Sequence, residues 1–113
     1  MKEIKAIIQP HMKDPVFDAL AQKEDLPGVT VESTSGWGRS KAADAEHPVE
    51  SGPHRFAKKV KLEIVVRDEQ LDELVDLIRE KAHTGRPGDG KIFVYDVGDA
   101  VRIRTGERGS DAI

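Results

Sequence analysis

The chain has 113 residues, which fits one domain with one hydrophobic core. Charged residues make up 35% of it, aromatic residues 4%, and the net charge is -3, so the core must be aliphatic and the chain lacks the basic excess of a general nucleic-acid binder. No cysteine is present, which excludes disulfides and thiolate metal sites, and no apolar run is long enough for a signal peptide or a membrane span. We therefore expect a cytoplasmic protein that does not insert into a membrane.

The first third of the chain predicts a strand, a helix and a second strand. A strand that ends at Pro10 is predicted by three alternating apolar residues, Ile4, Ala6 and Ile8. Residues 13–24 then predict a helix, in which Asp14 suits the N-cap and Pro15 the first helical position. The apolar stripe of this helix consists of Val16, Phe17 and Leu20. The β-branched start of VTVESTSGWGRS, at Val29, predicts the next strand.

A long loop separates this unit from a second one of the same kind. Residues 40–57 have two prolines, mixed charge and no periodicity, which predicts a structureless loop that is either functional or disordered. Residues 58–66 alternate as a strand through Val60, Leu62, Ile64 and Val66. Residues 67–83 predict a helix capped by Asp68, with an apolar face of Leu71, Leu74, Val75 and Ile78. KIFVYDV, from Lys91, does not alternate, so we expect a strand buried on both faces.

The order β-α-β, loop, β-α-β predicts a single α+β domain over residues 1–113. Two such units with an antiparallel sheet form the ferredoxin-like double βαβ fold. The helices cover one face of the sheet, and most candidate residues of the other face are apolar. We therefore expect an oligomer that buries the open faces.

A glycine-rich turn over residues 83–91 lies between the second helix and the last strand. In TGRPGDGK, Gly88 and Gly90 flank Asp89, and Lys91 follows. Glycines let backbone amides approach an anion closely, and the lysine adds a positive charge, so the turn suits a phosphate. The P-loop pattern is not matched, because a strand and not a helix follows the lysine. An ordinary glycine turn with a solvated lysine is the alternative.

Two further groups of residues suit an anion. Arg102 and Arg104, in the C-terminal segment 99–113, point the same way if VRIRT is extended, and paired guanidinium groups bind phosphate bidentately. A surface pair that bridges to acidic residues is the alternative. The glycines and arginine of SGWGRSK, at the mouth of the loop, are compatible with a flexible hinge as well.

Catalytic and metal-binding patterns are not evident in the sequence. The histidines show neither HxxxH nor HExxH spacing, and they are His11, His47, His54 and His83. No Ser-His-Asp set or carboxylate pair stands out. We expect no catalytic residue, no metal ligand and no enzyme activity.

These segments together resemble the PII signal-transduction (nitrogen regulatory) protein family over nearly the whole chain. TGRPGDGKIFVYDV resembles the family's nucleotide loop, TGxxGDGKIFV, and VRIRTGE resembles its C-terminal RIRTGE. MKEIKAII, SGWGRSK and KKVKLEIVV are weaker matches, the second of them to the family's GFGRQK.

The resemblance implies a homotrimer that binds ATP or ADP in the clefts between its subunits. It further implies that the flexible T-loop, residues 40–57, docks on a target protein, which is an enzyme, a transporter or a regulator; a membrane protein is compatible with this role. Matching positions imply a phosphate loop opened by Thr84 and Gly85 and formed by Gly88, Asp89, Gly90 and Lys91. The same phosphates are implied to contact Arg102 and Arg104. Residues implied to lie against the nucleotide from the neighbouring subunit are Gly36, Gly38 and Arg39. The adenine is implied to lie on Thr30, Glu63 and Val65.

Departures from the family pattern affect the second ligand and the loop. Ser40 replaces a glutamine that holds the Mg²⁺ ion carrying 2-oxoglutarate, and serine is too short to take its place. Lys59 matches the lysine that contacts the 2-oxoglutarate carboxylate, so half of that site remains. We therefore do not expect the family's usual 2-oxoglutarate response, although the sequence is still compatible with Mg²⁺ that binds together with the nucleotide. Gly52 replaces the tyrosine that enteric members modify, which excludes uridylylation there.

The resemblance leaves two regulatory functions open. The first is a nucleotide-binding PII-like trimer that regulates a partner through its loop. The second is a PII-like sensor of another small ligand or a metal, for example one linked to bicarbonate or to metal efflux, to which His47 and His54 would contribute. A slow nucleotide hydrolase is a third hypothesis, but no general base is evident.

Overall fold

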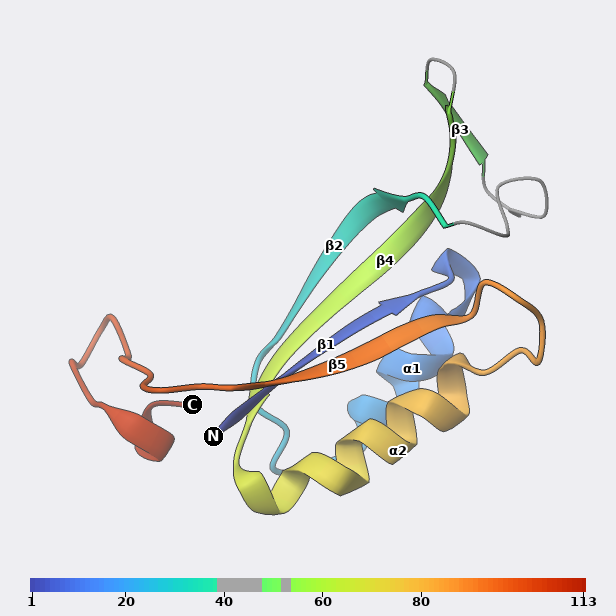
Figure 1. The fold of residues 1–113 in the computed structure, drawn as a ribbon. Coiled ribbons are helices and arrows are strands. Elements are labelled where there is room, and N and C mark those ends of the chain that lie inside the picture. Colours follow the sequence, from blue (N-terminus) through green and yellow to red (C-terminus); the bar gives the residue numbers. More distant parts are fainter. Residues whose placement is uncertain (39–47, 52–53) are drawn as a thin grey trace.

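An antiparallel sheet in the order β2–β4–β1–β5 forms the centre of the molecule (Figure 1). The computed structural model describes residues 1–38, 48–51 and 54–113. The strands are β1 (Lys2–Ile8), β2 (Val29–Gly36), β3 (Pro48–Ser51), β4 (His54–Val66) and β5 (Gly90–Asp96), and β3 pairs only with β4. The helices are α1 (Lys13–Leu20) and α2 (Leu71–Ala82), with 3₁₀ turns η1 (Pro10–Met12), η3 (Asp68–Gln70) and η4 (Gly109–Ala112). This order of strands confirms the ferredoxin-like prediction.

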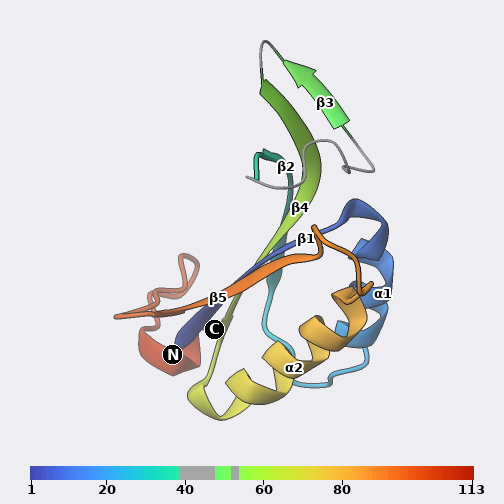
Figure 2. The ribbon, with the colours of Figure 1, turned by 45° about the vertical axis from the view of Figure 1, so that its right-hand side comes forward.

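Both helices lie on the same face of the sheet, and the hydrophobic core fills the space between (Figure 2). The alternating residues of β1 and β4 are buried there as predicted, including Ile4, Leu62 and Ile64 at 0% exposure. Val16 and Leu20 of α1 and Ile78 of α2 close the core from the helical side. The core is aliphatic, as the scarcity of aromatic residues predicts. Among the described residues, no helix is long and apolar enough to cross a membrane.

The starts of both helices differ from the predictions. The helical path begins at Pro10, where η1 forms with the Met12 N–H donating to the Gln9 carbonyl at 3.0 Å, so α1 starts before Asp14 and has Met12 at its N-cap. Asp14 is therefore not the cap, and Pro15 lies in the first turn. Asp68 also does not cap its helix, because it is the first residue of η3, and the N-caps of η3 and α2 are Arg67 and Gln70. Its carboxylate pairs instead with the N-terminal ammonium of the chain at 2.9 Å.

The open face of the sheet is more polar than predicted. Lys61 lies at its centre and forms ion pairs with Glu32 at 3.0 Å and Glu63 at 3.5 Å. The hydrogen bond and charge of Glu32 raise the pKa of Lys61. Apolar cover comes mainly from the edge strand β5, whose Phe93 is 42% exposed. The prediction that β5 is buried on both faces is wrong for the single subunit, because six of its seven residues are exposed and none is buried.

Part of the predicted structureless loop is a β-hairpin arm. β3 pairs with the first residues of β4, in a register that places Pro48 opposite Ala57 and Ser51 opposite His54. β4 is 13 residues long and projects beyond the sheet, where it holds this hairpin away from the helices (Figure 1). The sequence hides the hairpin because Pro48 and Pro53 interrupt the alternation. Ser40, His47 and Gly52 lie outside the described residues.

Candidate functional site

The glycine-rich turn between α2 and β5 is organised around the carboxylate of Asp89. This carboxylate accepts hydrogen bonds from the Thr84 N–H at 2.8 Å, from the Gly85 N–H at 3.1 Å and from the Thr84 hydroxyl. Burial acts to raise the pKa of Asp89, but the hydrogen bonds from Thr84 and Gly85 outweigh it and hold the pKa below its usual value. The charge of Asp89 is thus directed into the loop, where it shapes the backbone and stays away from an incoming anion.

A second set of bonds fixes the middle of the same loop. The Gly88 carbonyl accepts hydrogen bonds from Gln9 Nε2 at 2.8 Å and from Lys59 Nζ at 2.7 Å. Lys59 is one of the predicted site residues; it belongs to β4, and its ammonium group contacts this loop. Gln9 was not predicted, because a single glutamine after a strand has no distinctive pattern. Its near-complete burial is visible only in the folded chain.

Gly90 allows the loop to pass directly over the end of β1. Its φ is +104°, and a Cβ there would lie 1.7 Å from the Ile7 carbonyl oxygen. Only glycine combines that backbone conformation with so close an approach. The requirement for glycine is therefore steric at this position, and it fixes where Lys91 leaves the loop.

Positive charge gathers at this end of the sheet. Lys91 is exposed next to the loop, and in the described part of the chain it forms no ion pair, so its ammonium group is available to an anion. Lys58 and Lys59 line a neighbouring hollow of about 230 Å³ with the hydroxyl residues of β2, Ser33, Thr34 and Ser35. The local charge is positive although the whole chain is acidic.

The end of β2 approaches the loop from the other side. A Cβ on Gly36 would lie 3.5 Å from Cγ of Lys59, the same lysine that donates to Gly88. Trp37 follows and meets His54 edge to face, with 6.0 Å between the ring centroids. A Cβ on Gly38 would meet nothing within 4 Å, and Arg39 lies outside the described residues. Gly36 and Gly88 therefore both lie close to Lys59 within one subunit.

The three residues expected around the adenine lie together elsewhere on the sheet. Thr30, Glu63 and Val65 line a hollow of about 300 Å³, whose other walls are Glu3, Pro27, Gly28 and Ile113. Thr30 and Glu63 are partners across β2 and β4. Glu63 also pairs with Lys61, which orients its carboxylate. A hollow with hydroxyl and carboxylate acceptors and apolar walls suits an aromatic base with amino groups.

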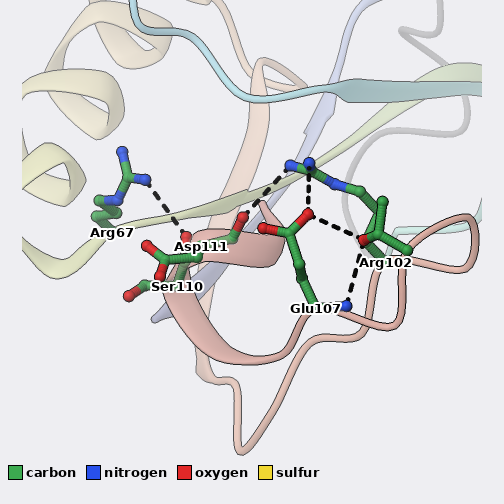
Figure 3. A network of polar contacts seen from close by, with 6 residues as sticks. Arg67, Arg102, Glu107, Ser110 and Asp111 are labelled. Carbon is green, nitrogen blue, oxygen red and sulfur yellow. Dashed lines mark hydrogen bonds and ion pairs between the residues drawn. The ribbon is translucent and has the colours of Figure 1, made fainter.

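The C-terminal segment forms a compact turn (Figure 3), and its last residue, Ile113, lines this hollow. The Arg102 carbonyl accepts from the Gly106 N–H at 2.7 Å, so VRIRT is a turn and not extended, and the two arginines do not alternate along a strand. Arg102 pairs with Glu107 at 3.1 Å and donates to the Asp111 carbonyl at 3.3 Å. Arg67, the residue after β4, donates a hydrogen bond to the Ser110 carbonyl at 3.3 Å. Arg104 is exposed and forms no ion pair within the described residues.

The predicted site residues thus fall into two groups that lie at different positions along the sheet, as the strand register and the two hollows show. The first group surrounds the glycine loop and includes Gly36, Lys59, Gly88 and Lys91. The second group consists of Arg102 and Arg104 in the C-terminal turn and of Thr30, Glu63 and Val65, whose hollow is also lined by Ile113. β5 separates Gly90 from Asp96 by about 20 Å, so one phosphate chain cannot contact both the glycine loop before β5 and the two arginines after it in one subunit.

Metal-binding side chains do not cluster in residues 1–38, 48–51 and 54–113. No group of three or more histidine, aspartate or glutamate side chains there could hold an ion. His54 contacts Trp37, and His47 is outside these ranges.

Comparisons with known proteins place this fold and these loops in one family. The fold is that of a crystal structure of Arabidopsis thaliana PII bound to citrate, with a TM-score of 0.80 and 38% identity over 99% of this chain and 91% of that one. The family model of nitrogen regulatory protein P-II matches residues 1–107. The chain is 48% identical to nitrogen regulatory protein P-II of Pasteurella multocida and of Bradyrhizobium diazoefficiens, and 47% identical to that of Klebsiella oxytoca, each over the full length of both chains. This chain therefore belongs to the nitrogen regulatory protein P-II family, as the sequence motifs predict.

Proposed function

We propose that the protein is a cytoplasmic signal-transduction protein that binds ATP or ADP between the subunits of a trimer and regulates a partner protein. The observation that carries the proposal is the division of the anion-binding and base-binding residues between the two ends of one sheet. Lys91 and the glycine loop lie at one end, and the two arginines with the hollow around Thr30 lie at the other. A site that needs both ends requires two copies of the chain.

A trimer has three interfaces, and each of them can join the glycine-loop end of one subunit to the arginine end of its neighbour. Closed symmetry brings the first end of one subunit against the second end of the next, so each interface repeats the same site. The exposed apolar residues of β5 support this assembly, because Phe93 and Tyr95 lie on the open face of the sheet. Lys5 lies 4.9 Å from the centre of the Tyr95 ring and covers part of this surface.

The division of labour within one site follows from the same geometry. One subunit contributes the glycine loop, Lys91 and the Gly36 end of β2 to the phosphates. Its neighbour contributes Arg102 and Arg104 to the same phosphates and the Thr30–Glu63–Val65 hollow to the adenine. Backbone amides, one ammonium and two guanidinium groups give many donors to a polyanion in a cleft of lowered dielectric constant. Mg²⁺ would add charge neutralisation on the phosphates.

The arm formed by β3 and β4 is the proposed contact with a partner. Gly36 and Lys59 lie at its base, and Lys59 donates a hydrogen bond to the loop that would hold the phosphates. A change at the phosphates therefore reaches the arm through Lys59 directly. We propose that the arm reports the state of the nucleotide site, and that the protein is a regulator and not an enzyme.

Isothermal titration calorimetry tests the proposal. The protein is titrated with ATP, ADP and AMP, each with and without Mg²⁺ and 2-oxoglutarate, after light scattering has established its oligomeric state. We expect a trimer that binds ATP or ADP, and no 2-oxoglutarate binding, because Ser40 replaces the glutamine. A folded trimer that binds none of the three nucleotides would refute the proposal. Binding of 2-oxoglutarate only with Mg-ATP would instead restore the family's usual nitrogen-sensing response.

A further inference from the structure

Only two polar residues of the described chain are buried, and both are glutamines that tie loops to the core. Gln70 donates to the Asp25 carbonyl at 2.9 Å and accepts from the Arg67 N–H at 3.0 Å, which closes the turn before α2. Gln9 is 8% exposed and donates to the Gly88 carbonyl at 2.8 Å. A buried amide is costly unless it is hydrogen-bonded, so each of these bonds constrains where its loop can lie.

We propose that Gln9 is a positioning residue for the anion site, which sets the direction of the peptide between Gly88 and Asp89. This inference rests on the proposed function and adds a residue to it. Gln9 hydrogen-bonds to the backbone of the loop, at the Gly88 carbonyl. It acts through the loop, from the point where β1 ends and η1 begins.

The geometry of the peptide bond gives the mechanism. In a planar trans peptide the carbonyl and the following N–H point in opposite directions. The Gly88 carbonyl points inward, toward the amide of Gln9 and the ammonium of Lys59. The Asp89 N–H therefore points away from both donors, toward the outside of the loop. An outward N–H beside Lys91 is the kind of backbone donor that binds a phosphate oxygen.

Two further contacts make the arrangement specific to this loop. Gly88 has φ = +96°, and a Cβ on it would lie 3.1 Å from Gln9 Nε2, so the amide packs against the bare backbone. The Asp89 carboxylate fixes the other half of the loop through Thr84 and Gly85. Gln9 is thus the neutral member of the pair that holds Gly88. It keeps the carbonyl in place when the ammonium of Lys59 is attracted elsewhere.

Three substitutions at Gln9 separate the hydrogen bond from the volume of the side chain. Gln9→Met keeps the length and removes the donor. Gln9→Glu keeps the shape and turns a negative charge toward the carbonyl. Gln9→Lys changes the shape and restores a donor. Gln22→Met, at an exposed glutamine after α1, is the matched control for Gln9→Met.

Two readouts are measured on the full-length protein. ADP affinity is followed by the fluorescence of Trp37, the single tryptophan, which follows Gly36 in the sequence. Amide hydrogen exchange of residues 84–91 is measured without nucleotide. We expect Gln9→Met to weaken ADP binding about fivefold to twentyfold, Gln9→Glu to weaken it further, and Gln9→Lys to restore most of it. Exchange should become faster in the first two variants and return toward the wild-type rate in the third.

The outcomes are decisive in each case. Unchanged ADP affinity and unchanged exchange in a folded Gln9→Met protein would overturn the inference. A loss of affinity that Gln9→Lys does not restore would show that Gln9 matters through its volume, which also overturns it. If the wild-type protein binds no ADP, the proposed function fails, and the exchange measurement still decides whether Gln9 positions the loop.

Discussion

Arg102 and Glu107 form an ion pair at 3.1 Å within the C-terminal turn, with Glu107 held in place by the hydroxyl of Thr105 at 2.9 Å (Figure 3). The pair joins a predicted phosphate ligand to a carboxylate of its own segment. Arg102 is 40% exposed, so water and salt screen the attraction. In the absence of an anion, Glu107 therefore occupies part of the guanidinium group that we assign to the nucleotide.

Replacing this carboxylate should tighten nucleotide binding. Glu107→Gln keeps an oxygen for Arg102 and Thr105 but removes the negative charge that repels phosphate. We expect ADP to bind about threefold more tightly at low salt and the gain to fade in high salt. Titration at two ionic strengths measures the effect, with Glu80→Gln on α2 as the control. Weaker binding would mean that Glu107 orients Arg102 and does not compete with the ligand.

Lys91 and Arg104, which form no ion pair within the described residues, should contribute more. Lys91→Ala and Arg104→Ala each remove a charge-assisted donor, so we expect each to weaken ATP binding by ~2 kcal/mol. Both side chains are exposed, and the melting temperature should stay close to that of the wild type. Calorimetry checks the affinity, and Arg79→Ala, at an exposed arginine of α2, controls for the loss of a surface charge. An unfolded variant would show that the residue has been misplaced.

Asp89 should titrate at an unusually low pH. The hydrogen bonds from Thr84 and Gly85 lower its pKa against the opposing effect of burial. A carboxyl group whose pKa is lowered by folding contributes its full stabilisation at every pH above the pKa of the unfolded chain. This stabilisation is lost as the pH falls through the lower pKa of the folded loop. The Thr84 and Gly85 amide signals in NMR spectra should therefore stay constant from neutral pH and shift only below about pH 3.9. In Asp89→Asn, the Thr84 and Gly85 amide signals should already be displaced at neutral pH. A titration midpoint of these signals above the ordinary pKa of aspartate in the wild-type protein would contradict the account.

Gly90 should tolerate no side chain. Gly90→Ala would place a Cβ 1.7 Å from the Ile7 carbonyl oxygen in a left-handed conformation, so the loop or β1 must move. We expect a loss of ~3 kcal/mol in the free energy of unfolding. Gly98→Ala is the matched control, because a Cβ there has no neighbour within 4 Å and no positive φ is involved. Chemical denaturation measures both variants, and equal stabilities would show that Gly90 is not constrained.

The sequence predicted the parts of the fold that depend on periodicity. The alternation of Ile4, Ala6 and Ile8, and that of the residues from Val60 to Val66, marked the buried face correctly because a strand has only two faces. The same reasoning did not apply to β5, whose apolar run faces solvent in one subunit. An apolar run without alternation is typical of a strand buried on both faces, and the exposed residues of β5 depart from that rule.

Local signals at the ends of elements were less informative. Asp14 and Asp68 have the composition of N-caps, but Pro10 started the first helix early and the N-terminal ammonium attracted the second carboxylate. The position of Gln9 against Gly88 joins residues 79 apart in the sequence, and no local pattern records such a contact. The motif residues were found by resemblance, whereas their division between two ends of a sheet emerged only from the topology.

The most direct test of the account is complementation in mixed trimers of Lys91→Ala and Arg104→Ala subunits. Each variant alone has a defect in every site, but an interface between unlike subunits in the correct order contains both native residues. Subunits are mixed by joint unfolding and refolding, and ATP binding is measured by calorimetry. We expect about a quarter of the interfaces to bind ATP with wild-type affinity. If mixing restores no high-affinity binding in intact trimers, Lys91 and Arg104 do not meet across an interface, and the proposed site is wrong.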